Sequence, residues 1–473
     1  MKYILQVLSA IRDFLWRATS NWVSAVGVIL ATLGAISFLA ILALEVGGLK
    51  IGNYPGIFSY LILPAIFVVG LVLIPIGLRL QRRREQKTGR PIHFPVFDFN
   101  NPRLRSVALL VLALTVVNLM IVSAATFKGV EVMDSTHFCG GTCHTVMTPE
   151  FTTYQRSPHA RVKCTECHIG SGANWFVKSK LSGSWQVVSV ALDLYPRPIP
   201  VPVEDLRPAR ETCEQCHWPT KHIGDRLRIF NRFAEDEKQT ETKTVLLMKT
   251  GGGEPGRAQG IHWHVDPNFT IRYRSDKSRQ KIFDVELTRA NGKPEVYKLD
   301  GAKPDGAEPG WRVMDCVDCH NRPTHVYQMP NDELDAVLTS GELDKSLPFI
   351  NREGLKAIQQ TYTSHAGAKE GIHKALTEFY RANFPDLVEK QPDRIDRAAD
   401  TLTRVYARNV FPEMRITWGT YPTFLKHEPG CFRCHDNEHK NEQGKTISKS
   451  CGLCHNILAV EEANPEILEV LHP

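Results

Sequence analysis

The chain has 473 residues, with 57 Lys and Arg against 51 Asp and Glu, and a formal net charge of +6. The charge is unevenly distributed, because the first 126 residues hold twelve basic but four acidic residues, which leaves the remainder slightly acidic. The basic excess therefore indicates membrane topology rather than a surface for nucleic acid, and we expect no nucleic-acid partner.

Three apolar runs near the N-terminus are each long enough to cross about 30 Å of hydrocarbon. They cover Trp22–Leu44, Ile57–Leu78 and Val107–Phe127. A buried helix of a soluble core is the alternative for any single run. A signal peptide is the alternative for the first run, but that run is long and lacks a clear small-residue cleavage site. Three clustered runs followed by none predict a multi-pass membrane anchor over residues 1–130, in contact with lipid.

Basic residues predict the orientation of these runs. The second and third runs are joined by the basic segment Arg79–Lys87, and Lys2, Arg12 and Arg17 lie before or near the start of the first run. The connection between the first two runs carries Lys50 alone. By the positive-inside rule, the N-terminus and the basic segment are cytoplasmic, and everything after the third run lies on the opposite side.

All twelve cysteines belong to six motifs in which a cysteine pair is followed directly by histidine. The motifs are Cys139-Gly-Gly-Thr-Cys143-His144, Cys164-Thr-Glu-Cys167-His168, Cys213-Glu-Gln-Cys216-His217, Cys316-Val-Asp-Cys319-His320, Cys431-Phe-Arg-Cys434-His435 and Cys451-Gly-Leu-Cys454-His455.

This pattern is typical of covalent c-type haem attachment, in which two thiols form thioethers and the adjacent histidine reaches the iron. Zinc sites and disulfide scaffolds are the alternatives, but neither requires a histidine directly after every second cysteine. We therefore predict six covalently bound haem c groups. The first motif has one extra residue between its cysteines, and Gly140 and Gly141 supply backbone freedom there.

Each iron can take a second axial ligand, and the spare histidines are the candidates. His93 lies in the predicted cytoplasmic connection and His472 lies next to the end of the printed sequence, so both are set aside. His262 and His264 are two apart in an expected strand and serve two adjacent haems, or one of them is a bystander. We favour six histidines as ligands and keep four in reserve: His159, His222, His262, His264, His325 and His427, then His137, His365, His373 and His439. Met147 is a further candidate for the first haem, with a core methionine as the alternative.

The predicted fold is mainly α, with three transmembrane helices, a multihaem domain of little regular structure and a small β insertion. Alternating residues at Thr270–Arg274, Lys281–Thr288 and Pro294–Leu299, with a hairpin at Ala290–Gly292, predict the insertion over residues 226–310. Helical patterns follow. We expect helices over Asp332–Lys345, Arg352–His365, Gly371–Phe384 and Asp393–Asn409, and a helical three-haem region over residues 311–473.

The stretch from Cys143 through Met147 and His159 to His168, with Trp175–Lys178 beyond it, resembles the NapC/NirT family of membrane-anchored multihaem cytochromes. The resemblance covers roughly residues 106–220, and we expect a three-haem region of this type over residues 131–225. It implies a bacterial inner-membrane protein whose haem domain lies in the periplasm. It also implies oxidation of menaquinol or ubiquinol near the first haem, as in anaerobic respiration, with a periplasmic cytochrome or reductase as electron acceptor.

The resemblance implies that Met147 binds the first iron, that His159 is a distal ligand and that Lys178 lies near the quinol. We add Lys180 and Gln186 as further quinol-site candidates. Three helices and six haems depart from the usual one helix and four or five haems, and the C-terminal half resembles larger inner-membrane cytochromes of metal-reducing bacteria.

Two other functions stay open. One is a terminal reductase of nitrite or hydroxylamine, which needs an iron with an open position. The other is a haem-wired anchor subunit without its own quinol site. The sequence also leaves open whether the chain forms homo-oligomers or hetero-oligomers.

Overall fold

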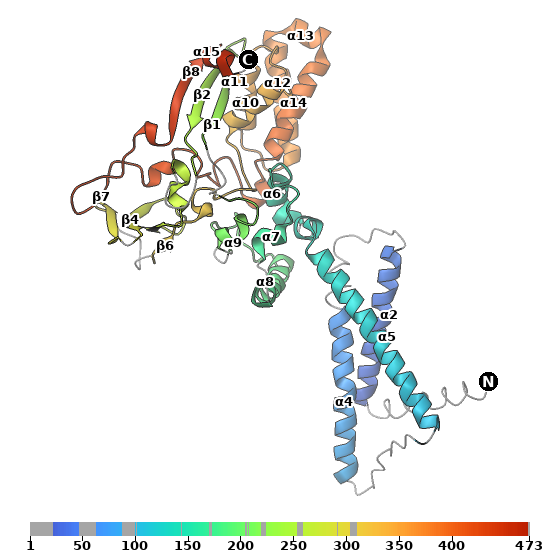
Figure 1. Cartoon of the computed structure of the whole chain (residues 1–473). Coiled ribbons are helices and arrows are strands. Elements are labelled where there is room, and N and C mark those ends of the chain that lie inside the picture. Colours follow the sequence, from blue (N-terminus) through green and yellow to red (C-terminus); the bar gives the residue numbers. More distant parts are fainter. Residues whose placement is uncertain are drawn as a thin grey trace. The chain divides into compact units, whose positions relative to one another are not determined.

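The computed structural model describes residues 22–46, 63–87, 100, 102–142, 144–169, 173–203, 206, 208–218, 224–252, 259–290, 292–302 and 310–471. The chain divides into two compact units, Met1–Thr142 and Cys143–Pro473 (Figure 1). Helix is more abundant than strand among the described residues, and the second unit also contains two antiparallel sheets.

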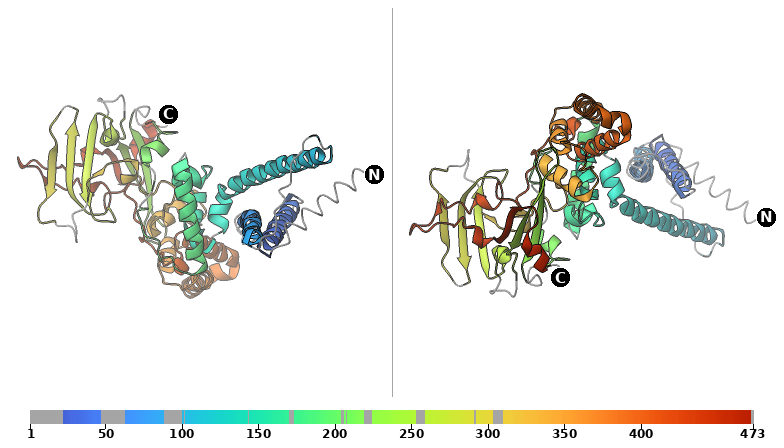
Figure 2. Two further views of the ribbon diagram at one scale, coloured as in Figure 1. Left: turned by 90° about the horizontal axis from the view of Figure 1, so that it is seen from below. Right: turned by 90° about the horizontal axis from the view of Figure 1, so that it is seen from above.

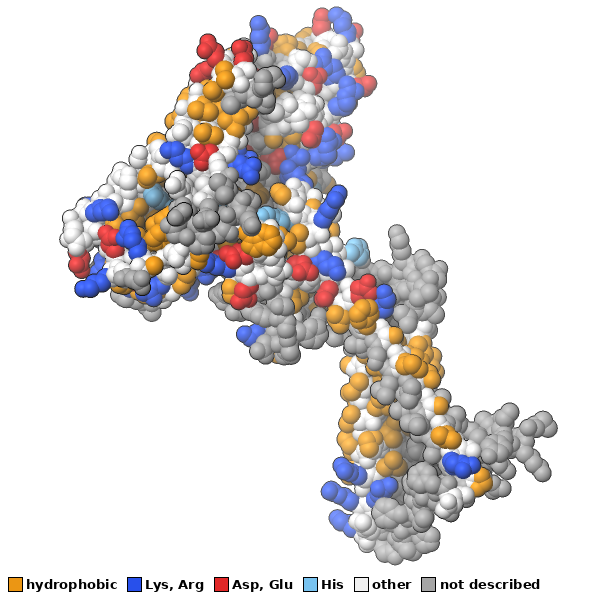
Figure 3. All heavy atoms as spheres, viewed as in Figure 1, with side chains coloured by type: hydrophobic (Ala, Val, Ile, Leu, Met, Phe, Trp, Pro, Cys, Tyr) orange, Lys and Arg blue, Asp and Glu red, His pale blue; other side chains and the backbone are white. Residues whose placement is uncertain are grey.

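The described part of the N-terminal unit consists of long helices that contain the first and third predicted apolar runs and the second from Leu63 onward, since residues 57–62 lie outside the described residues. They are α2 (Trp22–Val46), α4 (Leu63–Lys87) and α5 (Pro102–Met133), followed by the π-helical turn η2 (Phe138–Thr142). Two segments, Trp22–Leu39 and Leu63–Arg84, are long and apolar enough to cross a membrane. Hydrophobic side chains cover the exposed faces of these helices, and basic side chains gather where α4 ends (Figure 3).

The basic segment Arg79–Lys87 is helical, although the sequence predicts it as part of a connection. Arg, Leu, Gln and Lys are good helix formers, so nothing in this segment stops the helix. Basic residues in the last turn also interact favourably with the negative end of the helix dipole. The helix consequently continues beyond its apolar part and ends at Lys87.

Helices α2 and α4 pack closely through small residues. A Cβ atom placed on Gly70 of α4 would lie 2.5 Å from the backbone nitrogen of Ala31 in α2, and one placed on Gly27 would lie 2.8 Å from the carbonyl of Gly70. The hydroxyl of Ser24 donates a 3.0 Å hydrogen bond to the carbonyl of Ile74. Small residues that allow close backbone approach are typical of helix pairs in membranes.

Short helical turns carry the described cysteine motifs of the second unit. The second motif forms α7 (Cys164–His168), and the third begins at the end of α9 (Ala209–Cys213). The last three begin in the 3₁₀ turns η5 (Cys316–Asp318), η7 (Cys431–Arg433) and η8 (Cys451–Leu453). One helical turn places residues three apart on the same side, so the two cysteines of a motif face the same way. Two longer helices, α6 (His144–Gln155) and α8 (Ala173–Ala191), flank the second motif.

Strands from distant parts of the chain form two sheets, whose strands lie side by side in Figure 2. The three-stranded sheet has the order β1 (Arg226–Phe233), β2 (Glu241–Met248) and β8 (His455–Glu462). The five-stranded sheet has the order β6 (Arg312–Val313), β3 (Phe269–Ser275), β4 (Ile282–Arg289), β5 (Glu295–Leu299) and β7 (His439–Lys440). The predicted hairpin joins β4 to β5. Strands β6, β7 and β8 lie outside the predicted insertion, so the C-terminal segment completes both sheets.

Five helices between the fourth and fifth motifs enclose a hydrophobic core. They are α10 (Pro330–Ser340), α11 (Ile350–Ile358), α12 (His365–Asn383), α13 (Pro385–Lys390) and α14 (Pro392–Ala407). The sequence predicts four of these and misses α13, which is six residues long. Leu334, Ile350, Ile372 and Leu402 are fully buried in the core, and each contributes about 1.5–3 kcal/mol through burial. A last helix, α15 (Glu466–Leu471), follows β8.

The prediction of a strand at His262 and His264 is wrong. These residues lie in the 3₁₀ turn η4 (Ile261–Val265). A 3₁₀ helix has three residues per turn, so side chains two residues apart point in different directions rather than along one face. This change separates the two imidazole rings.

Candidate functional site

Each of four motif histidines lies beside a histidine from outside the motifs. The ring centres are 5.9 Å apart for His159 and His217, 6.2 Å for His168 and His325, 5.8 Å for His264 and His435, and 6.1 Å for His427 and His455. The fifth described motif histidine, His320, has its pKa lowered first by burial and then by the charges of His262 and His217.

These separations fit a metal ion between each pair of rings. A bond from a metal to an imidazole nitrogen is about 2 Å long, so two imidazoles that bind one metal from opposite sides have ring centres roughly 6 Å apart. Each pair takes one histidine from a Cys-x-x-Cys-His motif, which also supplies two thiols for a porphyrin. The residues present therefore fit haem c with two histidine ligands.

The paired histidines from outside the motifs form hydrogen bonds through one ring nitrogen, which leaves the other nitrogen available to bind a metal. His264 donates from Nδ1 to the carbonyl of Ile261 at 2.7 Å, and His325 donates from Nδ1 to the carbonyl of Glu150 at 2.9 Å. Nδ1 of His159 lies 3.3 Å from the carbonyl of Pro323. When Nδ1 carries the proton, Nε2 keeps its lone pair, and this is the usual arrangement of a metal-binding histidine.

Burial favours the neutral form of these rings. It is the largest cause that lowers the pKa of His168, His264 and His325, and also of His455. An imidazole must be unprotonated at one nitrogen to bind a metal, so a lowered pKa suits this role.

Contacts between cysteines place four motifs in sequence order. The thiol of Cys213 in the third motif hydrogen-bonds the thiol of Cys316 in the fourth. Burial, and then among other charges that of Cys319 in the fourth motif, raises the pKa of Cys434 in the fifth. The thiol of Cys431 in the fifth motif hydrogen-bonds that of Cys454 in the sixth. The cysteine hydrogen bonds therefore join the third motif to the fourth and the fifth to the sixth, and Arg433 of the fifth motif donates to the Asp318 carbonyl of the fourth at 2.6 Å.

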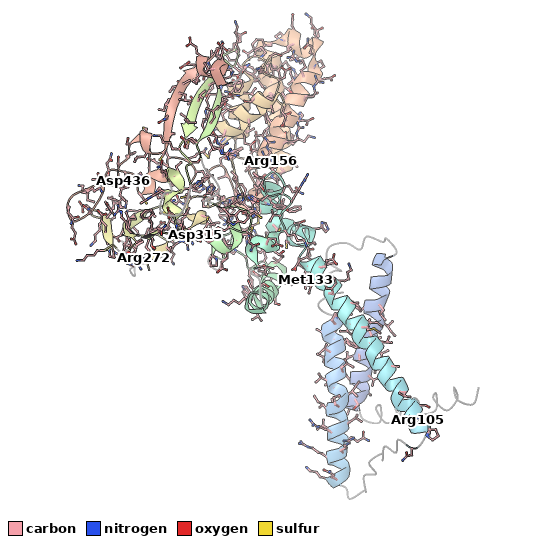
Figure 4. The ribbon with its side chains drawn as sticks, in the orientation of Figure 1. Arg105, Met133, Arg156, Arg272, Asp315 and Asp436 are labelled. Atoms are coloured by element: carbon pink, nitrogen blue, oxygen red, sulfur yellow. The ribbon has the colours of Figure 1, made fainter. Side chains whose placement is uncertain are left out.

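Acidic residues of the fourth motif stabilise this arrangement. The carboxylate of Asp315, labelled in Figure 4, accepts hydrogen bonds from the backbone of Cys316 at 2.7 Å and of Ala209 at 2.8 Å, and so joins η5 to α9. Asp318 is almost fully buried and accepts from the Tyr273 hydroxyl at 2.7 Å and from Arg312 Nε at 2.9 Å. These bonds connect the fourth motif to the third motif and to the five-stranded sheet.

Glu150 of α6 lies against the ligand candidate His325. One carboxylate oxygen of Glu150 is 3.1 Å from His325 Nδ1, in addition to the carbonyl contact, and is 3.7 Å from Arg322 Nη1. Arg322 in turn donates to the His325 carbonyl at 3.0 Å. The sequence gives no signal for this role of Glu150, because 175 residues separate it from His325.

Several predicted residues lie outside the described part of the chain. Cys143 and His222 are not described, nor are the side chains of His144 and Lys180.

Met147 packs against a cluster that includes Val146, Tyr327 and Tyr421. Lys178 and Gln186 are exposed on α8, and Gln186 Nε2 donates to Ser182 Oγ at 3.3 Å.

The four reserve histidines have different surroundings. His365 Nε2 lies 2.7 Å from the carbonyl of Val410, and His373 Nε2 lies 3.0 Å from Asp400, so both have protein partners within the helical region. His137 lies beside Gly141 of η2. His439 is fully buried in β7.

The cysteine motifs and the paired imidazoles define a c-type cytochrome. A family model described as the NapC/NirT cytochrome c family, N-terminal region, matches residues 101–196. The chain is 41% identical over 475 residues to the cytochrome c-type protein ImcH of Geobacter sulfurreducens. This match covers 97% of this chain and 92% of the relative. The chain belongs to the NapC/NirT cytochrome c family. No solved structure matches it.

Proposed function

We propose that the chain is a membrane-bound hexahaem cytochrome that oxidises a membrane quinol and relays electrons to a periplasmic acceptor. Haem iron supplies reversible one-electron oxidation and reduction when it is bound. The observation that carries the proposal is that four of the five described motif histidines lie beside a histidine from outside the motifs. Two histidine ligands close both axial positions, which favours electron transfer over substrate chemistry.

The pairing assigns the second ligands. His325 binds the haem of the second motif, and His159 binds that of the third. His262 serves the fourth motif, His264 the fifth and His427 the sixth. For the first motif, the family resemblance supports Met147 as the second ligand. His222 stays a candidate ligand, but it lies outside the described residues and is assigned to no motif.

The contacts between motifs support an ordered relay. Hydrogen bonds join the third site to the fourth, the fourth to the fifth and the fifth to the sixth. The short segment His320–His325 carries the fourth motif histidine and also the partner of the second. Its Thr324 hydroxyl lies 2.7 Å from that of Ser157, two residues before His159. We therefore place the second, third and fourth sites together at one end of the relay and the sixth site at the other.

The surface of α8 supports a quinol site at the membrane. Leu181, Trp185, Val188 and Leu192 are exposed at spacings of four, three and four residues, which places them on one side of the helix. An exposed apolar stripe with tryptophan suits the boundary between lipid and water. Lys178 and Gln186 lie on the same helix, where a cationic and an amide group can hold quinol hydroxyls.

A terminal reductase is less well supported. It requires an iron with an open position, and four of the six motif histidines lie beside a second histidine. A docking subunit would share the paired histidines but would lack quinol chemistry, so kinetics separate it from the proposed function.

Stopped-flow reduction of the oxidised, detergent-solubilised chain by a menaquinol analogue tests the proposal. We expect rapid reduction of the wild type and about a tenfold or greater loss of rate in Lys178→Met, with unchanged reduction by dithionite. Lys374→Met, on the exposed surface of α12, is the matched control and should retain the wild-type rate. A wild-type protein that dithionite reduces but quinol does not would contradict quinol oxidation.

A further inference from the structure

His439 is a buried histidine that the paired ligands leave without a role. It lies in β7 directly opposite Leu299 of β5, and directly opposite residues in an antiparallel pair point to the same face of a sheet. Tyr297, two residues before Leu299, shares this face and belongs to the hydrophobic cluster that Cys434 and Trp263 contact. His439 therefore faces the side of the sheet on which the fifth motif packs.

The two ring nitrogens of His439 have unequal surroundings. Nδ1 lies 2.8 Å from Oδ2 of Asp436, and the backbone nitrogen of His439 donates to Oδ1 of Asp436 at 3.0 Å. Nε2 is shielded from solvent and has no hydrogen-bonding partner among the described residues. Asp436 is labelled in Figure 4. Buried polar nitrogens are almost always paired, so an unpaired Nε2 indicates a partner outside the described residues, and a bound haem is the candidate.

The iron of the fifth site is an unsuitable partner for His439. His435 and His264 lie with ring centres 5.8 Å apart, and the two together would fill both axial positions of an iron bound there. The remaining polar groups of a haem are its propionate carboxylates. A carboxylate at Nε2, with Asp436 at Nδ1, would place an imidazolium between two anions, which gives two charge-assisted hydrogen bonds.

We propose that His439 binds a propionate of the haem held by the fifth motif and so sets the reduction potential of that haem. This inference rests on the proposed haem loading but not on quinol oxidation. The positive ring offsets the propionate charge next to the iron. Its loss would stabilise the oxidised, more positive iron and lower the potential of this one haem.

Spectroelectrochemical titration of the complete haem-loaded protein tests the proposal. In His439→Phe, which keeps a ring but has no donor, we expect one component of the titration to shift to lower potential while the low-spin spectrum stays unchanged. His373→Phe is the matched control, since His373 bonds Asp400 in the helical region, and its titration should match the wild type. An unchanged His439→Phe titration would overturn the proposal, and a new high-spin haem would also overturn it by showing that His439 binds iron.

A second variant covers the case in which His439→Phe fails to accumulate. His439→Gln keeps an N–H donor, and resonance Raman spectroscopy should show a shifted propionate band because the donor is no longer an imidazolium. An unshifted band would contradict propionate binding. Absence of haem from the fifth motif of the wild type would instead contradict the proposed hexahaem state, so the two failures are distinguishable.

Discussion

Arg433 of the fifth motif donates a 2.6 Å hydrogen bond from Nη2 to the backbone carbonyl of Asp318 in the fourth motif. The same guanidinium donates from Nη1 to the carbonyl of Arg279 at 2.7 Å and lies 3.8 Å above the ring of Phe424. One side chain therefore joins two attachment sites to the loop between β3 and β4. The spacing of adjacent sites depends on this bridge.

Replacing Arg433 should destabilise the haem-loaded protein. In Arg433→Met, three partly buried carbonyls, those of Gly430, Arg279 and Asp318, lose a charged donor, and we expect a loss of about 2 kcal/mol in the free energy of unfolding. Arg289→Met is the control, because Arg289 is exposed and forms one ion pair with Glu295, and such a pair contributes roughly 1 kcal/mol or less. Denaturant unfolding measures both changes, and equal losses in the two variants would contradict the bridging role.

Removing a paired histidine from outside the motifs should leave one haem iron without its second axial ligand. In His159→Ala, the third site loses its second imidazole, so we expect one haem to become high-spin while the others stay low-spin. Low-temperature electron paramagnetic resonance of the oxidised protein measures this. His365→Ala, in which the lost imidazole bonds the carbonyl of Val410, should keep the wild-type spectrum. An unchanged spectrum in His159→Ala would reject that ligand assignment.

The sequence predicts the attachment sites from local chemistry alone. Two thiols and a histidine within six residues specify a motif without any tertiary contact. The partners are not predictable in this way, since folding sets them: His325 follows His320 by five residues yet faces His168, and His159 lies near the second motif yet faces His217.

The conformation at His262 and His264 is likewise not predictable from the local sequence alone. A polar and apolar alternation favours a strand, but the His264 ring packs against the fifth motif histidine and the backbone forms a 3₁₀ turn. Strands β7 and β8 are likewise hard to predict, because they complete sheets whose other strands lie more than a hundred residues earlier. The longer helices of the apolar and helical regions are predicted as elements, since their periodic patterns are long, but their ends differ from the predicted ones: α11 ends at Ile358 rather than His365, and α12 begins at His365 rather than Gly371.

Changing Glu150 should shift the potential of one haem. Its carboxylate lies 3.1 Å from Nδ1 of His325 and makes that ligand more electron-rich. In Glu150→Gln the carbonyl contact remains but the negative charge is lost, so the potential of the second haem should rise. A redox titration measures the shift, and Glu353→Gln, in the helical region beside Lys356, is the control. A titration identical to the wild type would show that the carboxylate has no influence on His325.

Enlarging Gly70 should separate two helices of the N-terminal unit. Its missing Cβ allows the backbone of Ala31 to approach, and a leucine side chain there would force the helices apart at a cost of about 1–3 kcal/mol. We expect Gly70→Leu to lower the thermal unfolding midpoint of the detergent-solubilised protein. Val69→Leu adds one carbon on an exposed face of the same helix and should leave the midpoint unchanged. Equal midpoints for the two variants would contradict close packing of α2 and α4.

Intact mass spectrometry of the purified, denatured chain tests the central claim most directly, because thioether-bound haem stays attached when the fold is lost. The account predicts a single species heavier than the 53.3 kDa polypeptide by six haem groups. A mass equal to that of the bare polypeptide, or one that exceeds it by fewer than six haems, would contradict the claim.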